Sequence, residues 1–302
     1  MLEPAVQVIN FRKNYGSFTA VDQISFKVLP GEIFGLLGPN GAGKTTTLEC
    51  LEGLRRADGG ELRVMGVSPA REPRRLLGLI GVQLQTGSLP GYCSVAEAMR
   101  FFSAYHGVAP DFVSLERLGL GDNLKTQYHA LSTGQKRRLA LALAVAHRPP
   151  VLILDEPTAG LDVATRAALH RLLKELREAG TTILLSTHDM AEAETLADRV
   201  AILLKGRLAA VGTPREITAA GAGLTKISVR TDGECLAGIS FPGVARQSRQ
   251  EDYLIFFTAA PGPSVAAMIA QIDSAGDQLI DLRVERPSLE ERFLELTTEE
   301  VS

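Results

Sequence analysis

A glycine-rich segment directly after an apolar run is the feature that most constrains the fold of this chain. The segment GPNGAGKT covers Gly38–Thr45 and follows the apolar run IFGLL at Ile33–Leu37. Its spacing, G-x-x-x-x-G-K-[ST], predicts a loop that holds the phosphates of a nucleotide between a strand and a helix. Backbone N–H groups can surround an anion only where the chain curls tightly, and Gly38, Gly41 and Gly43 permit that curl. A glycine turn that binds nothing is the alternative, and the complete motif in a strand–loop–helix context disfavours it.

The polar residues at the end of this loop have distinct expected roles. We expect Lys44 to reach the outer phosphates and the Thr45 hydroxyl to ligate Mg²⁺, while the following helix adds the positive end of its dipole. The residues expected to contact the nucleotide here are Gly38, Pro39, Asn40, Gly41, Ala42, Gly43, Lys44, Thr45 and Thr46.

A second apolar run ends in two carboxylates. The segment VLILDEP places Asp155 and Glu156 directly after Val151–Leu154. Alone, an acidic pair in this position is more typical of a solvated turn. Downstream of a phosphate-binding loop it is typical of P-loop nucleoside triphosphatases, in which the strand-end Asp helps to hold Mg²⁺. We therefore expect Asp155 to be a metal ligand and Glu156 to polarise an attacking water.

Alternating apolar runs and helical patterns indicate the fold class. Short apolar runs cover Val151–Asp155, Thr181–Thr187 and Arg199–Gly206. Such runs are typical of strands buried on both faces of a parallel sheet. Between them, residues 164–180 have leucines at helical spacing and end on a glycine that predicts the helix C-terminus. The alternation predicts an α/β core.

The length of 302 residues allows two domains. We expect a first domain over residues 1–222, into which a helical subdomain of about residues 88–148 is inserted. Residues 219–223 are rich in Ala and Gly and predict a linker. Residues 223–302 then predict a small α+β accessory domain, which carries 7 basic and 13 acidic residues.

Composition narrows the function classes. The net charge of −3 argues against a nucleic-acid-binding surface, so we expect no nucleic-acid partner. The cysteines Cys50, Cys93 and Cys235 form no CxxC pair, which fits a reducing cytoplasmic compartment. No stretch approaches the roughly 20 apolar residues that span a bilayer, and the N-terminus lacks the layout of a signal peptide. Any membrane role is therefore expected to be peripheral.

A third segment carries a family resemblance. The run LSTGQKRRLALALAVAHRP starts at Leu131, shortly before the run that ends at Asp155. It resembles the signature of ATP-binding cassette (ABC) ATPases, which is usually written LSGGQ and stands here as Leu131-Ser132-Thr133-Gly134-Gln135. The resemblance covers roughly residues 5–215. It implies an α/β P-loop NTPase fold of the ABC ATPase type, ATP and Mg²⁺ as cofactors, and ATP hydrolysis as the activity.

The same resemblance assigns further residues. Tyr15 matches the aromatic residue that stacks on adenine, and Asp162 matches the loop that couples two sites. Gln85 matches the glutamine that senses Mg²⁺ and the attacking water, although Gln83 lies two positions before it. His188 matches the histidine that contacts the γ-phosphate, against the alternative of an ordinary surface residue. The implied catalytic residues are Lys44, Gln85, Glu156 and His188, and the implied metal ligands are Thr45, Gln85 and Asp155.

In the family that this chain resembles, the signature acts in trans. Two cassettes pair head to tail, and each ATP lies between the phosphate loop of one and Ser132 and Gly134 of the other. We therefore expect a second ATP-binding subunit, in the first instance another copy of this chain. Thr133 departs from the consensus glycine, and we expect an ordinary backbone dihedral angle there.

The C-terminal region points to one branch of the family. The segment ERPSLEERFLELT at Glu285–Thr297 resembles the tail of ATPase subunits of ABC-2 type exporters, which include drug-resistance pumps. Ser288 and Glu291 are also spaced as a capping box, so the segment is consistent with an ordinary closing helix. The exporter resemblance implies a membrane-spanning permease subunit as partner and a location on the inner face of the cell membrane.

Two alternatives belong to other classes. A soluble mechanochemical ABC ATPase without a membrane partner is the main one, although the short distance from Thr45 to Leu131 leaves no room for a long coiled coil. A regulatory module that binds nucleotide without hydrolysis conflicts with the intact Glu156 and His188. For a transporter, the segment after Gln85 is where the family docks helices of the membrane subunit. Its apolar residues are Leu89, Tyr92, Val95, Met99, Phe101, Phe102 and Tyr105.

Overall fold

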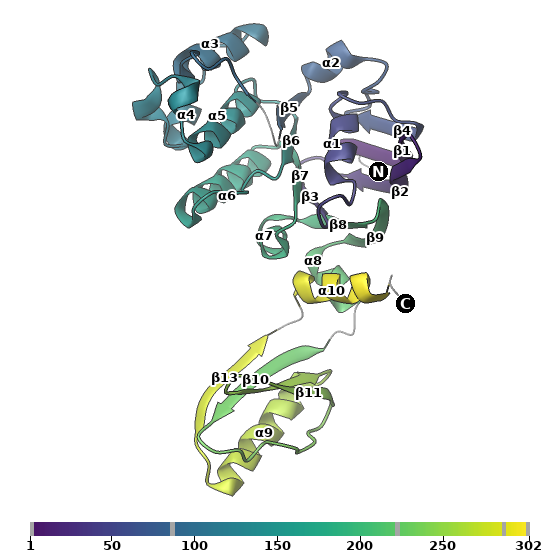
Figure 1. Cartoon of the computed structure of the whole chain (residues 1–302), viewed down its shortest axis with the longest axis vertical. Coiled ribbons are helices and arrows are strands. Elements are labelled where there is room, and N and C mark those ends of the chain that lie inside the picture. Colours follow the sequence, from purple (N-terminus) through teal and green to yellow (C-terminus); the bar gives the residue numbers. More distant parts are fainter. Residues whose placement is uncertain (1–2, 85–87, 221–223, 286–287, 300–302) are drawn as a thin grey trace. The chain divides into compact units, whose positions relative to one another are not determined.

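The computed structural model describes residues 3–84, 88–220, 224–285 and 288–299. Its contacts divide the chain into two compact units, Met1–Pro214 and Arg215–Ser302. The predicted domain boundary at residue 222 falls a few residues inside the second unit. Figure 1 shows the elements of both units, coloured along the chain.

The first unit contains two sheets. An antiparallel sheet has the order β2-β1-β4, and a six-stranded sheet has the order β5-β6-β7-β3-β8-β9, parallel except for β9. The strands are β1 (Val6–Tyr15), β2 (Phe18–Val28), β3 (Ile33–Leu37), β4 (Gly59–Val64), β5 (Ile80–Gln83), β6 (Val151–Asp155), β7 (Thr182–Thr187), β8 (Arg199–Leu204) and β9 (Arg207–Gly212). The predicted α/β core with a largely parallel sheet is confirmed. All residues of β3 and β6 are buried, as their apolar runs indicated.

Helices of the first unit fall into two groups. One group accompanies the sheets: α1 (Lys44–Leu51), α2 (Pro73–Leu77), α6 (Val163–Glu178) and α7 (Met190–Leu196). The other lies between β5 and β6 in the sequence and forms a separate helical cluster (Figure 1): α3 (Val95–Tyr105), α4 (Phe112–Arg117), the short 3₁₀ turns Gly121–Asn123 and Tyr128–Ala130, and α5 (Thr133–Val145). Helix α6 ends at Glu178, two residues before Gly180, whose φ of 98° provides the left-handed turn that the sequence indicated.

Helix α1 is packed between the two sheets. It contacts β2 and β4 on one side and β6 on the other. Its apolar residues Leu48 and Leu51 are fully buried in a core that also contains Phe26, Phe34 and Ile153. The helix is therefore held by apolar packing along its length, which fixes the loop at its N-terminus.

Sheet register places the expected site residues at one edge. Leu37, the last residue of β3, is paired with Thr187, and Asp155 is paired with Ser186. Because parallel strands present their carboxyl ends at the same edge, the segments after β3, β6 and β7 leave the sheet together. These segments contain the phosphate loop, the acidic pair and His188.

The second unit is a small α+β domain. A four-stranded antiparallel sheet has the order β11-β12-β10-β13, and helix α9 packs against it through a small apolar core. Its elements are α8 (Pro214–Ala219, at the boundary between the units), β10 (Thr225–Thr231), β11 (Val244–Gln250), β12 (Tyr253–Thr258), α9 (Pro261–Ala275), β13 (Leu279–Glu285) and α10 (Leu289–Glu299). The capping box of α10 is confirmed, since Ser288 and Glu291 exchange two bonds of 3.2 Å. Of the predicted linker, residues 221–223 lie outside the described part.

Candidate functional site

The phosphate loop has the curled backbone that its glycines predict. Gly38 has φ 151° and Gly43 has φ 102°. A Cβ atom at Gly38 would lie 2.3 Å from the carbonyl oxygen of Leu203, and one at Gly43 would lie 2.7 Å from that of Ala20. Both positions are therefore closed to any side chain, both by backbone conformation and by the neighbouring strands.

Lys44 lies inside this loop. Its Nζ donates to the carbonyl oxygens of Gly38 at 2.7 Å and Pro39 at 3.1 Å, and the residue is 6% exposed. Burial lowers the pKa of the ammonium, while the charges of Glu156 and Asp155 favour its protonated form. The ammonium is thus held inside the curled loop, where burial removes the water that would stabilise its charge. An entering phosphate would place negative charge beside it.

Two oxygen ligands meet beside the loop. The Thr45 hydroxyl donates to Asp155 Oδ2 at 2.9 Å, and the Ser186 hydroxyl donates to Asp155 Oδ1. Mg²⁺ prefers a few protein oxygens together with substrate phosphates, so this pair fits the ion. Within the described residues, no cluster of three or more His, Cys, Asp and Glu side chains provides an all-protein metal site. The third predicted ligand, Gln85, lies outside the described residues.

Glu156 and His188 form a pair next to these ligands. His188 Nδ1 lies 3.1 Å from Glu156 Oε1, and the Glu156 side chain is 11% exposed against 56% for His188. The backbone of Glu156 is left-handed, with φ 48°. Arg137 donates to the Glu156 carbonyl oxygen at 3.0 Å. The backbone N–H of Glu156 donates to the Ser186 carbonyl oxygen at 3.2 Å. These bonds at both ends of the residue hold a conformation that a non-glycine residue seldom adopts.

A buried carboxylate connects the segments that carry Glu156 and His188. Glu192 is 4% exposed and accepts hydrogen bonds from Thr158 Oγ1 at 2.9 Å and Thr187 Oγ1 at 2.8 Å. Its other oxygen lies 3.0 Å from His170 Nε2. Thr158 follows Glu156 closely and Thr187 precedes His188, so one side chain fixes the distance between the two loops.

The signature residues lie on the helical cluster, which Figure 1 shows apart from α1. Ser132 is the N-cap of α5, and it exchanges a capping box with Gln135 at 3.2 Å and 2.9 Å. Thr133 begins the helix with a negative φ, so the expected ordinary dihedral angle is confirmed. A Cβ atom at Gly134 would be 3.7 Å from Leu161, which is ordinary contact. No packing among the described residues therefore requires glycine at this position.

Comparison with known proteins places these features in a family. The family described as ABC transporter matches residues 21–159. A Nod factor export ATP-binding protein I from Cupriavidus metallidurans is 37% identical, and the alignment covers 98% of each chain. The linearmycin resistance ATP-binding protein LnrL of Bacillus subtilis is 32% identical over 97% of this chain and 98% of the relative. This chain belongs to the ABC transporter family.

Solved structures agree with the membership. The ATP-binding subunit of an ABC transporter aligns with a TM-score of 0.67 and 29% identity over 70% of this chain and 91% of its own. A nucleotide-free cassette aligns with a TM-score of 0.60 at 22% identity, over 70% of this chain and 92% of its own, and shows the shared fold. The ABC protein described here is an ATP-binding subunit and an ATPase.

Two of the ABC residues named from the sequence have local structural partners. Tyr15 is 39% exposed, with Lys13 Nζ at 5.6 Å and the Arg55 guanidinium at 5.4 Å from its ring centre. Asp162 is the N-cap of α6 and accepts from Thr165 N at 2.9 Å and Oγ1 at 2.7 Å. The hydrogen bond from the Thr165 backbone, and after it the one from the Thr165 hydroxyl, lower the pKa of Asp162. Asp162 therefore stabilises the start of α6 in addition to any role toward a partner.

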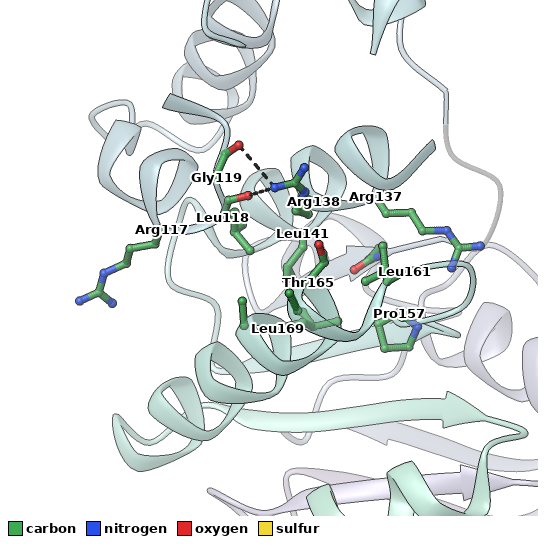
Figure 2. A pocket seen from close by; sticks show the side chains of 13 residues that line it. Arg117, Leu118, Gly119, Arg137, Arg138, Leu141, Pro157, Leu161, Thr165 and Leu169 are labelled. Carbon is green, nitrogen blue, oxygen red and sulfur yellow. Dashed lines mark hydrogen bonds between the residues drawn. The ribbon is translucent and has the colours of Figure 1, made fainter. Parts of the chain in front are cut away.

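A cavity of about 250 Å³ lies where the helical cluster of this ABC protein meets α6 (Figure 2). Leu161 and Leu169 line it from the segment after Glu156 and from α6, and Leu141 lines it from α5. Arg138 binds the end of α4 to α5, since its Nη1 donates to Leu118 O at 2.8 Å. The signature helix and the segment after Glu156 thus share an incompletely packed junction.

Three residues of the site were not found from the sequence. Ser186 binds Asp155, Arg137 binds the Glu156 backbone, and Glu192 joins the segments that carry Glu156 and His188. Ser186 carried a usable signal, because it is a hydroxyl directly after the apolar residues of a predicted strand. Arg137 and Glu192 carried none, because charged residues on helices are normally solvated.

Proposed function

We propose that this chain powers export through a separate membrane subunit and that it hydrolyses ATP between two head-to-tail cassettes. The observation that carries the proposal is the full-length match to exporter ATP-binding proteins, which extends over the accessory domain as well as the cassette. No helix in the described residues is long and apolar enough to cross a membrane. We infer from the proposed role as an ATP-binding subunit that the path for cargo lies in the membrane subunit.

The chemistry follows from the geometry of the site. Lys44 and the loop N–H groups bind the phosphates, and Thr45 and Asp155 would hold Mg²⁺, which would neutralise phosphate charge when bound. Glu156 would accept the proton of the attacking water, and His188, 3.1 Å from it, would contact the γ-phosphate and orient that carboxylate. Ser186 keeps the Asp155 carboxylate turned toward Thr45. Gln85 and the stacking of adenine on Tyr15 remain predictions.

The signature supports the paired arrangement. Ser132 and Thr133 are exposed at the N-terminus of α5, where backbone donors and the helix dipole favour an anion. Gly134 has no steric reason for being glycine inside this chain. A glycine is needed where another molecule approaches the backbone closely, and the phosphate of an ATP on a second cassette would be such a molecule.

A groove beside helix α3 supports the membrane partner. It has a volume of about 590 Å³ and is lined by β5, α3 and α5 and by the end of α1. Of the predicted docking residues, Val95 and Met99 are buried core, while Phe101 is 67% and Tyr105 is 63% exposed. The lining of this α3 groove includes Leu54, Leu77, Leu89, Phe101, Tyr105 and Leu143. Its apolar character is typical of a surface that receives a partner helix.

The experiment isolates the tagged chain from membranes of its host and reconstitutes it with the multi-span protein that accompanies it. We expect ATP hydrolysis that depends on both proteins and accumulation of cargo inside inverted vesicles. The alternative, a mechanochemical ATPase without a membrane partner, predicts full hydrolysis by the isolated chain and no specific association with a membrane protein. That outcome would overturn the proposal.

A further inference from the structure

Glu52 is a buried carboxylate without a partner at the α3 groove. The residue is 6% exposed, it lines the groove, and neither of its carboxylate oxygens has a hydrogen-bond partner among the described residues. Burying a carboxyl group without a hydrogen-bond partner costs free energy, and a partner placed against Glu52 would remove that cost.

Three features of the surroundings oppose a negative charge at this position. The side chain is desolvated, Asp155 and Glu49 add like charge, and Glu52 is the C-cap of α1, where the helix dipole is negative. The first two raise the pKa of Glu52 to about 8. Each of the three would instead favour a cation placed beside the carboxylate.

The described residues of the chain provide no such cation. Lys136 also lines the groove, but its Nζ lies 5.1 Å from the centre of the Tyr128 ring, and it gives no hydrogen bond to Glu52. Two histidines line the groove wall, His106 and His147, and their ring centres stack at 3.7 Å. Burial lowers the pKa of both, which favours the neutral rings. Within the described residues Glu52 has no counter-ion, so a cation beside it would be supplied by another molecule.

We propose that a Lys or Arg side chain on the docked helix of the membrane subunit enters the α3 groove and pairs with Glu52. The inference rests on the proposed function, because it names the contact that the partner makes in that groove. The apolar rim would receive the apolar face of the helix, and the cation would reach the floor. Glu52 ends the helix whose first residue is Lys44, so the contact joins the partner to the phosphate loop through a single packed helix.

The test measures the affinity of the purified membrane subunit for the chain by biolayer interferometry in detergent. Glu52→Gln keeps the shape of the side chain and removes its charge, and we expect it to weaken binding about 30-fold or more, as for a buried charge partner. Glu49→Gln is the matched control on the same helix, since Glu49 already pairs with Arg55. We expect the control to bind within twofold of the wild type.

A charge exchange between the two proteins would identify the partner residue. It would also distinguish a lost contact from a misfolded variant. Glu52→Lys should abolish binding, and replacing one Lys or Arg of the membrane subunit's cytoplasmic helices by Glu should restore it. Equal affinity of Glu52→Gln and wild type would overturn the cation contact while leaving the proposed function intact. Absence of any binding by the wild type would overturn both. A loss of ATP-dependent self-association by Glu52→Gln, with unchanged capture of the membrane subunit, would assign the groove to a second copy instead.

Discussion

At the scale of single residues, the site depends on a few charges in restricted positions. Glu156 has a left-handed backbone and bonds at both ends, and Lys44 is enclosed by its own loop. Glu156→Gln should retain ATP binding and lower turnover about 100-fold or more, because the amide cannot accept the proton. Lys44→Ala should weaken binding as well as turnover. Phosphate release and nucleotide titration on both variants are the measurements, and near-normal turnover of Glu156→Gln would remove that residue from the mechanism.

Glu52 gives a second prediction at this scale, which concerns pH. The pKa of the Glu52 carboxyl is 4.5 in the unfolded chain and about 8 in the folded chain. The free energy of unfolding of the wild type therefore falls as pH rises between these two values. The amide of Glu52→Gln does not titrate. The free energy of unfolding of the variant minus that of the wild type should therefore rise by up to about 1.4 kcal/mol per pH unit in this window and then level off.

Denaturant unfolding of the isolated chain at a series of pH values measures this difference. The Glu49→Gln protein serves as the reference, because its carboxylate already has a partner. A difference that does not vary between pH 5 and 8 would show that Glu52 is solvated or paired.

At the scale of elements, two loops are fixed to each other by one helix. Glu192 on α7 accepts bonds from Thr158 and Thr187, which lie beside Glu156 and His188. Glu192→Ala would leave these buried hydroxyls and His170 without their acceptor, so we expect a loss of about 3 kcal/mol in stability and a marked fall in turnover. Glu192→Gln should recover most of both, because its amide oxygen still accepts. Thermal unfolding and steady-state hydrolysis test this, and a normal rate in the Ala variant would refute the positioning role.

A further prediction concerns the exposed aromatic residues of helix α3 at the α3 groove. Phe101 and Tyr105 are largely exposed, while Val95 and Met99 anchor the helix in the core. Phe101→Glu and Tyr105→Glu should therefore leave the helix folded but disrupt an apolar contact with the membrane subunit. We expect strongly reduced capture of the subunit and retained ATP binding, with Val113→Glu as an exposed control on α4. Undiminished capture would place the contact elsewhere.

At the scale of the whole molecule, the phosphate loop and the signature lie on separate parts of the first unit. One chain provides one of each, so under the proposed function a complete site would need a second cassette. In the Glu156→Gln protein, ATP should persist and hold two copies together, giving a dimer mass in light scattering with Mg-ATP and a monomer mass without it. Ser132→Arg should abolish this dimer while sparing nucleotide binding. A monomer at saturating ATP would argue against pairing of identical chains.

The sequence by itself determined the nucleotide site of the cassette. The runs that became β3, β6 and β7 are so apolar that only a buried parallel sheet accommodates them, and such a sheet brings Gly38, Asp155 and His188 to one edge. Thr45 and Asp155 meet there as predicted. The exposed edge strand β11 was not predicted, because VARQSRQ has too few apolar residues to reveal a strand that is held by main-chain pairing to β12.

Only the tertiary structure decided what the charged helical residues do. In the sequence, Glu52 and Glu192 are acids on amphipathic helices and resemble any solvated side chain. Packing of α1 between two sheets buries Glu52 without a partner, whereas packing of α7 surrounds Glu192 with donors. The environment of a charge depends on elements far away in the chain, and local pattern carries no information about them. The sequence therefore specified which segments meet at the edge of the sheet, and the assembled fold decided which carboxylate holds them together and which one has no partner among the described residues.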